Sequence, residues 1–302
     1  DAHAHFEESI ARYDPQRHNG LTFVYGQDPG VMSHAHETWA LWLRGYADQA
    51  LTRARAALTL AQESGFLINE AIAYHFLALT HQFRREQQAA QQAAAAEVAI
   101  STEQGFPFWH AMGMITQGGA LLAQGQEQEG LALMRQGIEA HRTTGAEIGN
   151  TYWIALLAEG YGKTGQAEEG LATLTLALQT MRKNDERWWE AELHRLKGEL
   201  TLQQQFKVQG STLKVENPHS AFSNPQSEAE ACFLKAIEIA KRQQAKSLEL
   251  RATMSLARLW QSQGKTAEAH KLLSEIYGWF TEGFDTKDLQ EAQALLAELA
   301  TA

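Results

Sequence analysis

Small and apolar residues recur along the chain with a period of 40 residues. The stretch 152–178 shows the repeating unit most clearly, because it reads as two helices joined by a tight turn at Gly165. Small residues stand where two helices must approach each other. On the first helix of each unit they are Thr38, Ala78, Gly118, Ala158 and Gly198. On the second helix they are Ala50, Ala90, Gly130 and Gly170. Such columns of residues with a common period predict a repeat of helical hairpins.

Two further columns share this period. One is apolar and comprises Leu58, Val98, Ile138 and Leu178. The other falls where each second helix should end and comprises Gly65, Gly105, Gly145 and, less favourably, Asp185. Glycine after a helix adopts the left-handed conformation without a Cβ penalty. Because one hairpin cannot bury its apolar face alone, the hairpins are expected to stack and share a continuous core.

The columns predict the boundaries of most hairpins. We expect complete hairpins at 31–64, 67–104, 107–144, 147–184 and 247–282. Another hairpin begins near 186, but the small residue expected at 210 appears at Ala231, which implies an insertion of about 21 residues. The polar segment 205–227 fits a surface loop that carries this insertion. Extra helices are expected at 2–13 and 285–300, and a loop at 16–30.

The predicted fold is therefore an all-α, right-handed α-solenoid of about six helical hairpins with extra N- and C-terminal helices. We expect it to form a single domain over 1–302. Alanine, leucine, glutamine and glutamate are abundant, which favours helix. The chain starts at Asp1 with helix-like sequence rather than with methionine, so we expect it to be a fragment of a larger multidomain protein.

Charge and composition exclude several classes of function. The net charge of −10 argues against nucleic-acid binding, which relies on clustered lysine and arginine. No apolar run approaches the roughly 20 residues of a membrane span. The single cysteine, Cys232, precludes an internal disulfide and suits a reducing compartment, so a cytoplasmic location is expected.

Two hairpins carry residues of a known repeat. The hairpin at 147–184 has Ile154, Leu157, Ala158, Tyr161, Gly165 and, where alanine is usual, Gly170. The hairpin at 247–282 has Leu256, Ala257, Trp260, Gly264 and Ala269. This pattern resembles the tetratricopeptide repeat (TPR), although the period is 40 rather than 34. Thr38, Arg85 and Glu37 fit that pattern poorly.

A narrower resemblance covers nearly the whole chain outside the insertion. The segments 24–30, 101–106, 186–200, 242–252 and 277–289 together look like the C-terminal repeat regions of large bacterial proteins with predicted ATPase or nucleotide-cyclase modules. The resemblance implies a bacterial signalling protein with an N-terminal cyclase or DNA-binding module and an NTPase module, which this chain lacks. It does not identify a ligand.

The motifs that suggest catalysis or metal binding each fail a test when taken alone. The Gly162-Lys163-Thr164 triplet has Leu157 where a phosphate-binding loop needs glycine, and it ends a predicted helix instead of following a strand. In the segments 3–5 and 34–37, histidines two apart on a helix point to different faces. Ala40 stands where the zinc-protease pattern needs histidine. We therefore expect no catalytic site, no cofactor and no metal.

The TPR resemblance implies that the first helix of each hairpin lines a concave groove. Helical spacing from the small residues places on this face Met32, Trp39, Trp42, His75, Tyr152, Lys163, Glu192, Arg195, Glu199, Arg251 and Arg258. The early part is then aromatic and the late part charged. Three guanidinium groups on one face suit a carboxylate or an acidic peptide. The alternative is that Glu192, Glu199 and their neighbours pair with these arginines.

Two functions remain open from the sequence. The first is a non-catalytic, regulatory repeat domain that binds a protein or peptide, an acidic one being favoured, or another domain of the same protein. The second is a small-molecule sensor whose effector is held by the aromatic residues Trp39, Trp42 and His75. Nucleic acid and membrane are excluded as partners, and the oligomeric state is left open.

Overall fold

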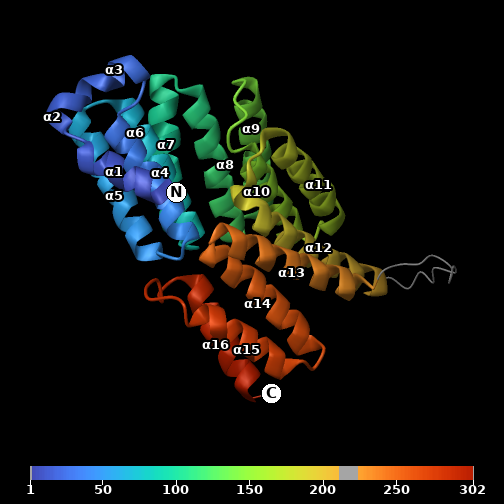
Figure 1. Ribbon diagram of the computed structural model, residues 1–302. Helices are drawn as coiled ribbons and strands as arrows, with labels where there is room; N and C mark the ends of the chain where they lie inside the picture. The colour runs from blue at the N-terminus through green and yellow to red at the C-terminus, as the bar shows by residue number, and fades with distance from the viewer. Residues whose placement is uncertain (1, 211–223, 302) are drawn as a thin grey trace. The chain divides into compact units, whose positions relative to one another are not determined.

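The computed structural model describes residues 2–210 and 224–301, and all regular elements in these ranges are helices (Figure 1). Six hairpins follow one another along the chain. They are α4 (Pro29–Leu43) with α5 (Ala47–Ser64), α6 (Leu67–Phe83) with α7 (Gln87–Gln104), α8 (Pro107–Ala123) with α9 (Glu127–Thr143), α10 (Asn150–Lys163) with α11 (Ala167–Asn184), α12 (Glu190–Gly210) with α13 (Pro225–Gln243), and α14 (Lys246–Ser262) with α15 (Thr266–Tyr277).

The remaining elements lie before, between and after the hairpins. They are α1 (Ala2–Arg12), α2 (Pro15–His18), the 3₁₀ turns η1 (Asn19–Leu21) and η2 (Arg187–Trp189), α3 (Thr22–Tyr25), and α16 (Lys287–Thr301). The chain divides into two compact units. Unit 1 comprises Asp1–Glu147 and Phe280–Asp288, and unit 2 comprises Ile148–Trp279 and Leu289–Ala302. Whether they form one domain over 1–302 stays a prediction.

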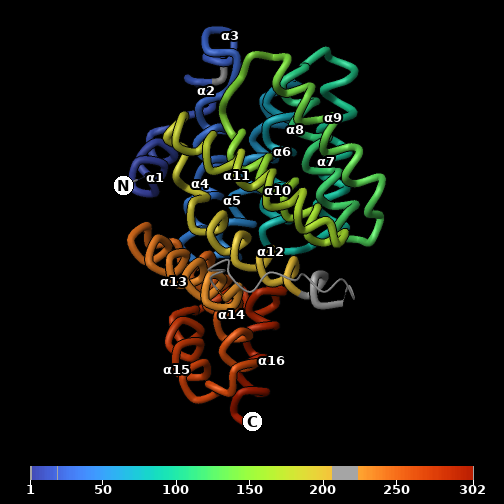
Figure 2. The backbone as a smooth tube through the Cα atoms, turned by 90° about the vertical axis from the view of Figure 1, so that its right-hand side faces the viewer, coloured from blue at the N-terminus to red at the C-terminus, as the bar shows by residue number. Residues whose placement is uncertain are grey.

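Consecutive helices pack on each other from α4 to α9 in unit 1 and from α10 to α15 in unit 2, and Figure 2 follows the backbone through these antiparallel pairs. The first helices of consecutive hairpins also contact each other: α4 with α6, α6 with α8, α10 with α12, and α12 with α14. Among the described residues, no two consecutive second helices make comparable contact. The first helices are therefore closer together, and they form the inner face of the curved stack in each unit.

The small residues lie at the helix crossings, as the sequence predicts. Gly118 on α8 and Gly130 on α9 face each other so closely that a Cβ on Gly118 would lie 2.7 Å from the Gly130 carbonyl oxygen. The same Cβ would lie 2.8 Å from the backbone nitrogen of Met134. Ala78, Ala90 and Ala158 are also fully buried. Bulkier side chains at these crossings would force the backbones apart.

The chain reverses with left-handed residues at the positions that the repeat predicts. The hairpin turns contain Gly45, Gly125, Gly165 and Gly264, with φ between 71° and 93°. Among the described residues, three non-glycine residues have positive φ: Arg85 (61°), Asp185 (56°) and Gln244 (56°). Arg85 replaces glycine in a hairpin turn, whereas Asp185 and Gln244 end second helices. Each of these backbones is strained relative to glycine.

The register of the interrupted hairpin corrects one prediction. Ala231 is exposed, whereas Ala229 is fully buried, so Ala231 is not the small residue of the crossing. Ala229 is followed by the buried Phe233, Ala236 and Ala240, the same spacing that follows Gly170. The insertion is therefore 19 residues long, because Ala229 stands where residue 210 is expected. The segment 228–240 contains several alanines, and spacing along the sequence does not distinguish the one at the helix crossing from its neighbours.

Two predicted loops are partly helical. The helix α12 continues to Gly210 and α13 begins at Pro225, so both ends of the predicted loop 205–227 are helical, and 211–223 lie outside the described residues. The predicted loop 16–30 contains α2, η1 and α3, and α4 already begins at Pro29. Asp28 caps α4 by accepting hydrogen bonds from the backbone nitrogens of Gly30 and Val31.

The segment 280–288 is tied into unit 1 by charged contacts. The guanidinium of Arg84, which is 3% exposed, pairs with Asp48, Glu86 and Asp285. Glu282 accepts hydrogen bonds from the backbone nitrogens of Asp48 and Gln49 at the start of α5. These contacts hold the segment against the turns of the first two hairpins.

We expect Gly118→Ala to destabilise the protein. The added Cβ would overlap two backbone atoms, and overpacking of this kind costs up to about 3 kcal/mol. This cost exceeds the gain of about 1 kcal/mol in helix propensity. Thermal unfolding followed by circular dichroism should therefore show a lower Tm. The control is Gly20→Ala, whose Cβ meets nothing within 4 Å. Equal Tm values for the two variants would contradict the close crossing of α8 and α9.

We expect Gln244→Gly to stabilise the protein, because glycine removes left-handed strain worth about 1–2 kcal/mol. The exposed Gln244 side chain loses little packing. The matched variant Gly264→Ala, at φ 78° with open space around its Cβ position, should lose about 1 kcal/mol. Urea unfolding measures both free energies. Shifts of the same sign would show that backbone strain is not the cause.

Candidate binding surface

The inner face of unit 1 carries an aromatic cluster between α4 and α6. The rings of Trp39 and Phe76 lie 5.0 Å apart, and His36 lies 4.7 Å from Phe76, measured between ring centroids. Phe6 of α1 stacks on His36 at 6.1 Å. Met32, also predicted for this face, packs with Trp39 against the buried core beneath them. These rings pack mainly on one another.

Two predicted groove residues of unit 1 are covered by protein, which corrects their assignment to an open groove. Trp42 is 3% exposed and stacks on Phe83 at 4.5 Å. His75 is fully buried, with its Nδ1 3.1 Å from Oε1 of Glu97. Burial raises the pKa of Glu97, and His75 opposes that rise. Helical spacing indicates the direction of a side chain, but the packing of the next helix decides its exposure. Trp39 remains half-buried, so the aromatic part offers little open surface.

The inner face of unit 2 is charged, and its charges are paired. Arg195 of α12 donates to Oε1 and Oε2 of Glu192 at 2.7 and 2.9 Å and to Oε1 of Glu199 at 2.8 Å. Ser255 of α14 also donates to Glu199, at 2.6 Å. Arg251 lies 3.9 Å from Glu192. The acids therefore pair with the arginines, the alternative that the sequence left open.

The first helix α10 extends this network. Lys163 Nζ lies 2.7 Å from Oε1 of Glu159. Burial alone would raise the pKa of Glu159, but Lys163, Arg195 and Arg251 hold it at about 2. The sequence pattern did not lead to a prediction for Glu159. It directly follows Ala158, one of the small residues of the repeat, just as Glu199 directly follows Gly198. The same register could have identified it.

Tyr152 and Glu192 are also buried, with 3% of each exposed, so the prediction that their side chains line an open groove is wrong for them as well. The ring of Tyr152 contacts Trp153, Trp188 and Trp189, and burial raises the pKa of its hydroxyl. By contrast, the side chains of Lys163 and Arg258 are 47% and 48% exposed. Arg258 pairs with Glu291 of α16 at 3.4 Å.

The charged inner face of unit 2 thus presents balanced, mutually satisfied charges with an accessible edge. We define this face by Glu159, Lys163, Glu192, Arg195, Glu199, Arg251, Ser255 and Arg258, together with Glu291 of α16 as the partner of Arg258. An acidic ligand would meet arginines that are already paired, so it would have to replace Glu192 or Glu199 as their partner. Such an exchange keeps the arginines paired, but the displaced glutamate must then find another cation or water as its partner.

Comparison with known proteins gives the fold. No protein-family model matches the chain, and no curated protein matches it in sequence. The crystal structure of the apo form of RapI matches with a TM-score of 0.50 and 12% identity, covering 90% of this chain and 97% of that one. A Rap protein complexed with Competence and Sporulation Factor matches with a TM-score of 0.55 and 11% identity, covering 89% of this chain and 76% of that one.

A third match is the crystal structure of a signal transduction ATPase with numerous domains and a tetratricopeptide repeat sensor, from Pyrococcus horikoshii. The identity is 14% and the TM-score 0.46, and the match covers 90% of this chain and 38% of that one. The predicted all-α, TPR-like solenoid is confirmed. None of the described helices is both long and apolar enough to cross a membrane.

We expect Arg195→Met to destabilise unit 2 strongly, because it leaves the buried Glu192 without its main partner. Breaking a buried pair from one side costs about 3–5 kcal/mol. Arg258→Met removes a pair at the surface, which is worth less than about 1 kcal/mol. Urea unfolding of the two variants measures the difference. A small and equal loss for both would mean that the network is not buried in solution.

Proposed function

We propose that this chain is a non-catalytic, regulatory repeat domain that binds a protein or peptide on the inner face of its first helices. The charged inner face of unit 2 is the primary contact, with Lys163 and Arg258 at its accessible edge. An acidic segment is the favoured partner, supplied by another protein or by another domain of the same protein.

The observation that carries this proposal is the paired but reachable ion network across α10, α12 and α14. Arg195 and Arg251 are held in place by Glu192 and Glu199, so their guanidinium groups are already positioned before a ligand arrives. A carboxylate of the partner takes over one of these pairings, and Lys163 and Arg258 attract it from solution. Bidentate pairing makes arginine well suited to such recognition.

Binding on this face also provides a route to regulation. Because α12 contacts both α10 and α14, a ligand that changes their pairing changes the spacing of consecutive first helices. Small changes in spacing add up along a stack and alter its curvature. We infer that this change is transmitted to an attached effector module.

The proposed context is a bacterial, cytoplasmic signalling protein. It is supported by the resemblance of segments such as 186–200 and 277–289 to repeat regions of that class. The fold shared with a Rap protein that was solved in complex with Competence and Sporulation Factor also supports a binding role.

The proposal is tested with a library of acidic, neutral and basic peptides. The chain should retain acidic peptides, and Lys163→Glu and Arg258→Glu should each weaken their binding about tenfold, because an attractive charge becomes repulsive. Fluorescence anisotropy measures the affinities. Binding should also weaken as salt is added.

The matched control is Arg182→Glu, which makes the same charge change at an exposed position of the second helix α11. It should leave the affinities unchanged. If Arg182→Glu weakens binding as much as Arg258→Glu, net charge rather than the inner face attracts the peptides. No retention of any peptide class would also count against the proposal.

A further inference from the structure

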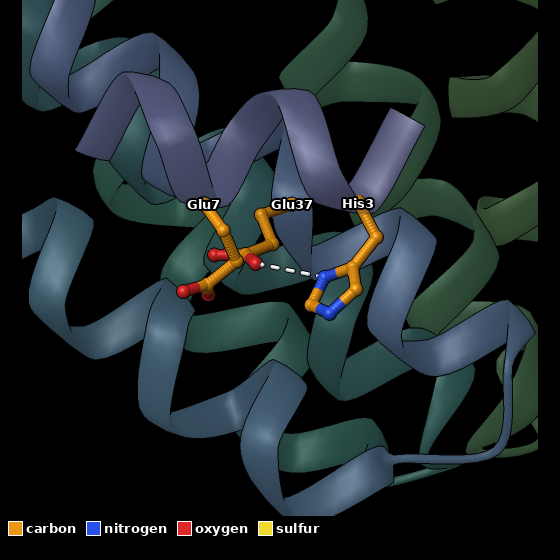
Figure 3. A group of neighbouring side chains, drawn as sticks. All are labelled: His3, Glu7 and Glu37. Atoms are coloured by element: carbon orange, nitrogen blue, oxygen red, sulfur yellow. Dashed lines mark hydrogen bonds and ion pairs between the residues drawn. The ribbon is translucent and has the colours of Figure 1, made fainter. Parts of the chain in front are cut away.

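Three side chains that are distant in sequence meet between α1 and α4. His3 and Glu7 lie one turn apart on α1, and Glu37 lies on α4. Figure 3 shows the three side chains turned toward one another. One ligand atom from each lies within 4.8 Å of the other two. The two histidine segments that fail as metal motifs separately, 3–5 and 34–37, thus each supply one member of this group.

Arg53 of α5 orients the two carboxylates. Its Nε lies 2.8 Å from Oε2 of Glu37, and its Nη2 contacts Oε1 of Glu7. The other oxygen of Glu37, Oε1, lies 3.1 Å from Nδ1 of His3. Each carboxylate therefore has one oxygen held by the guanidinium, and Glu37 turns its second oxygen toward the imidazole. Residues of this kind behind the ligands commonly set their orientation at metal sites.

The spacing and the donor atoms suit a zinc-like ion. Ligand atoms about 2.1 Å from a tetrahedral zinc lie about 3.4 Å from each other. The 3.1 Å between His3 and Glu37 is close to this value, and the 4.8 Å limit requires only a modest side-chain adjustment. One imidazole nitrogen with two carboxylate oxygens is a donor set that favours zinc over magnesium or calcium, which prefer oxygen alone.

The charge and burial of the group also favour a cation. Glu7 and Glu37 share the guanidinium of Arg53, which compensates one of their two negative charges when both are ionised. Glu37 is fully buried, and its Oε2 accepts no hydrogen bond despite its ion pair with Arg53. Buried carboxylates require compensating charge, and a divalent ion would supply it.

We propose that His3, Glu7 and Glu37 form a binding site for a divalent transition ion of the zinc type, with water in the fourth position. Arg53 is a positioning residue of this site. The ion joins α1 to α4 directly beside the contact of Phe6 with His36, so it fastens α1 over the aromatic cluster of unit 1.

The test uses the full chain, stripped of metal with a chelator and titrated with Zn²⁺ by calorimetry. Wild-type protein should bind one ion at this site, and Co²⁺ should give the absorption bands of a four-coordinate ion. His3→Ala and Glu37→Gln should each weaken binding at least tenfold. The matched control is His5→Ala, which removes the exposed histidine of the same segment and should leave the affinity unchanged.

Limited trypsin cleavage after Arg12 provides a second readout that does not depend on the Glu37 variant folding normally. Zn²⁺ should slow this cleavage in wild-type protein and in His5→Ala, but not in His3→Ala. The proposal is overturned if His3→Ala keeps the wild-type affinity, if His5→Ala weakens binding equally, or if Zn²⁺ leaves the cleavage rate unchanged.

Discussion

The close approach of paired helices is the constraint on which the rest of the structure depends. Where Gly118 meets Gly130, each backbone fills the space that a Cβ would need on the other. The same condition recurs with alanine at Ala78, Ala90 and Ala158. Because these crossings are so tight, consecutive hairpins can stack in register and bring their first helices into contact within each unit.

The packing of first helices in turn decides the chemistry of the inner face. Once α10, α12 and α14 are neighbours, their charged side chains are partly removed from water and must find partners. Arg195 therefore holds Glu192 and Glu199, and the surface is balanced rather than strongly basic. A ligand on such a surface competes with internal partners, which favours specific pairing over general electrostatic attraction and couples binding to helix spacing.

The same requirement operates at the start of the chain, where α1 covers α4. None of the residues of α1 is buried, so its attachment relies on a few contacts, among them Phe6 on His36 and the carboxylates around Arg53. A buried glutamate at this junction is costly unless positive charge is held beside it. Arg53 provides one such charge, and the geometry of His3 and Glu7 is suited to a second.

The sequence by itself determined the repeat, the turns and nearly all hairpin boundaries, because backbone conformation and helix crossing impose local rules on residue size. Even Arg85 stands in its predicted turn with positive φ. Only the tertiary structure decided that Ala229 rather than Ala231 lies at its crossing, that Trp42, His75 and Tyr152 are covered, and that His3 meets Glu37. These outcomes depend on which side chains of different helices come into contact. Spacing along one helix specifies the direction in which each side chain points. The distance from that side chain to the neighbouring helix is set only when the hairpins pack.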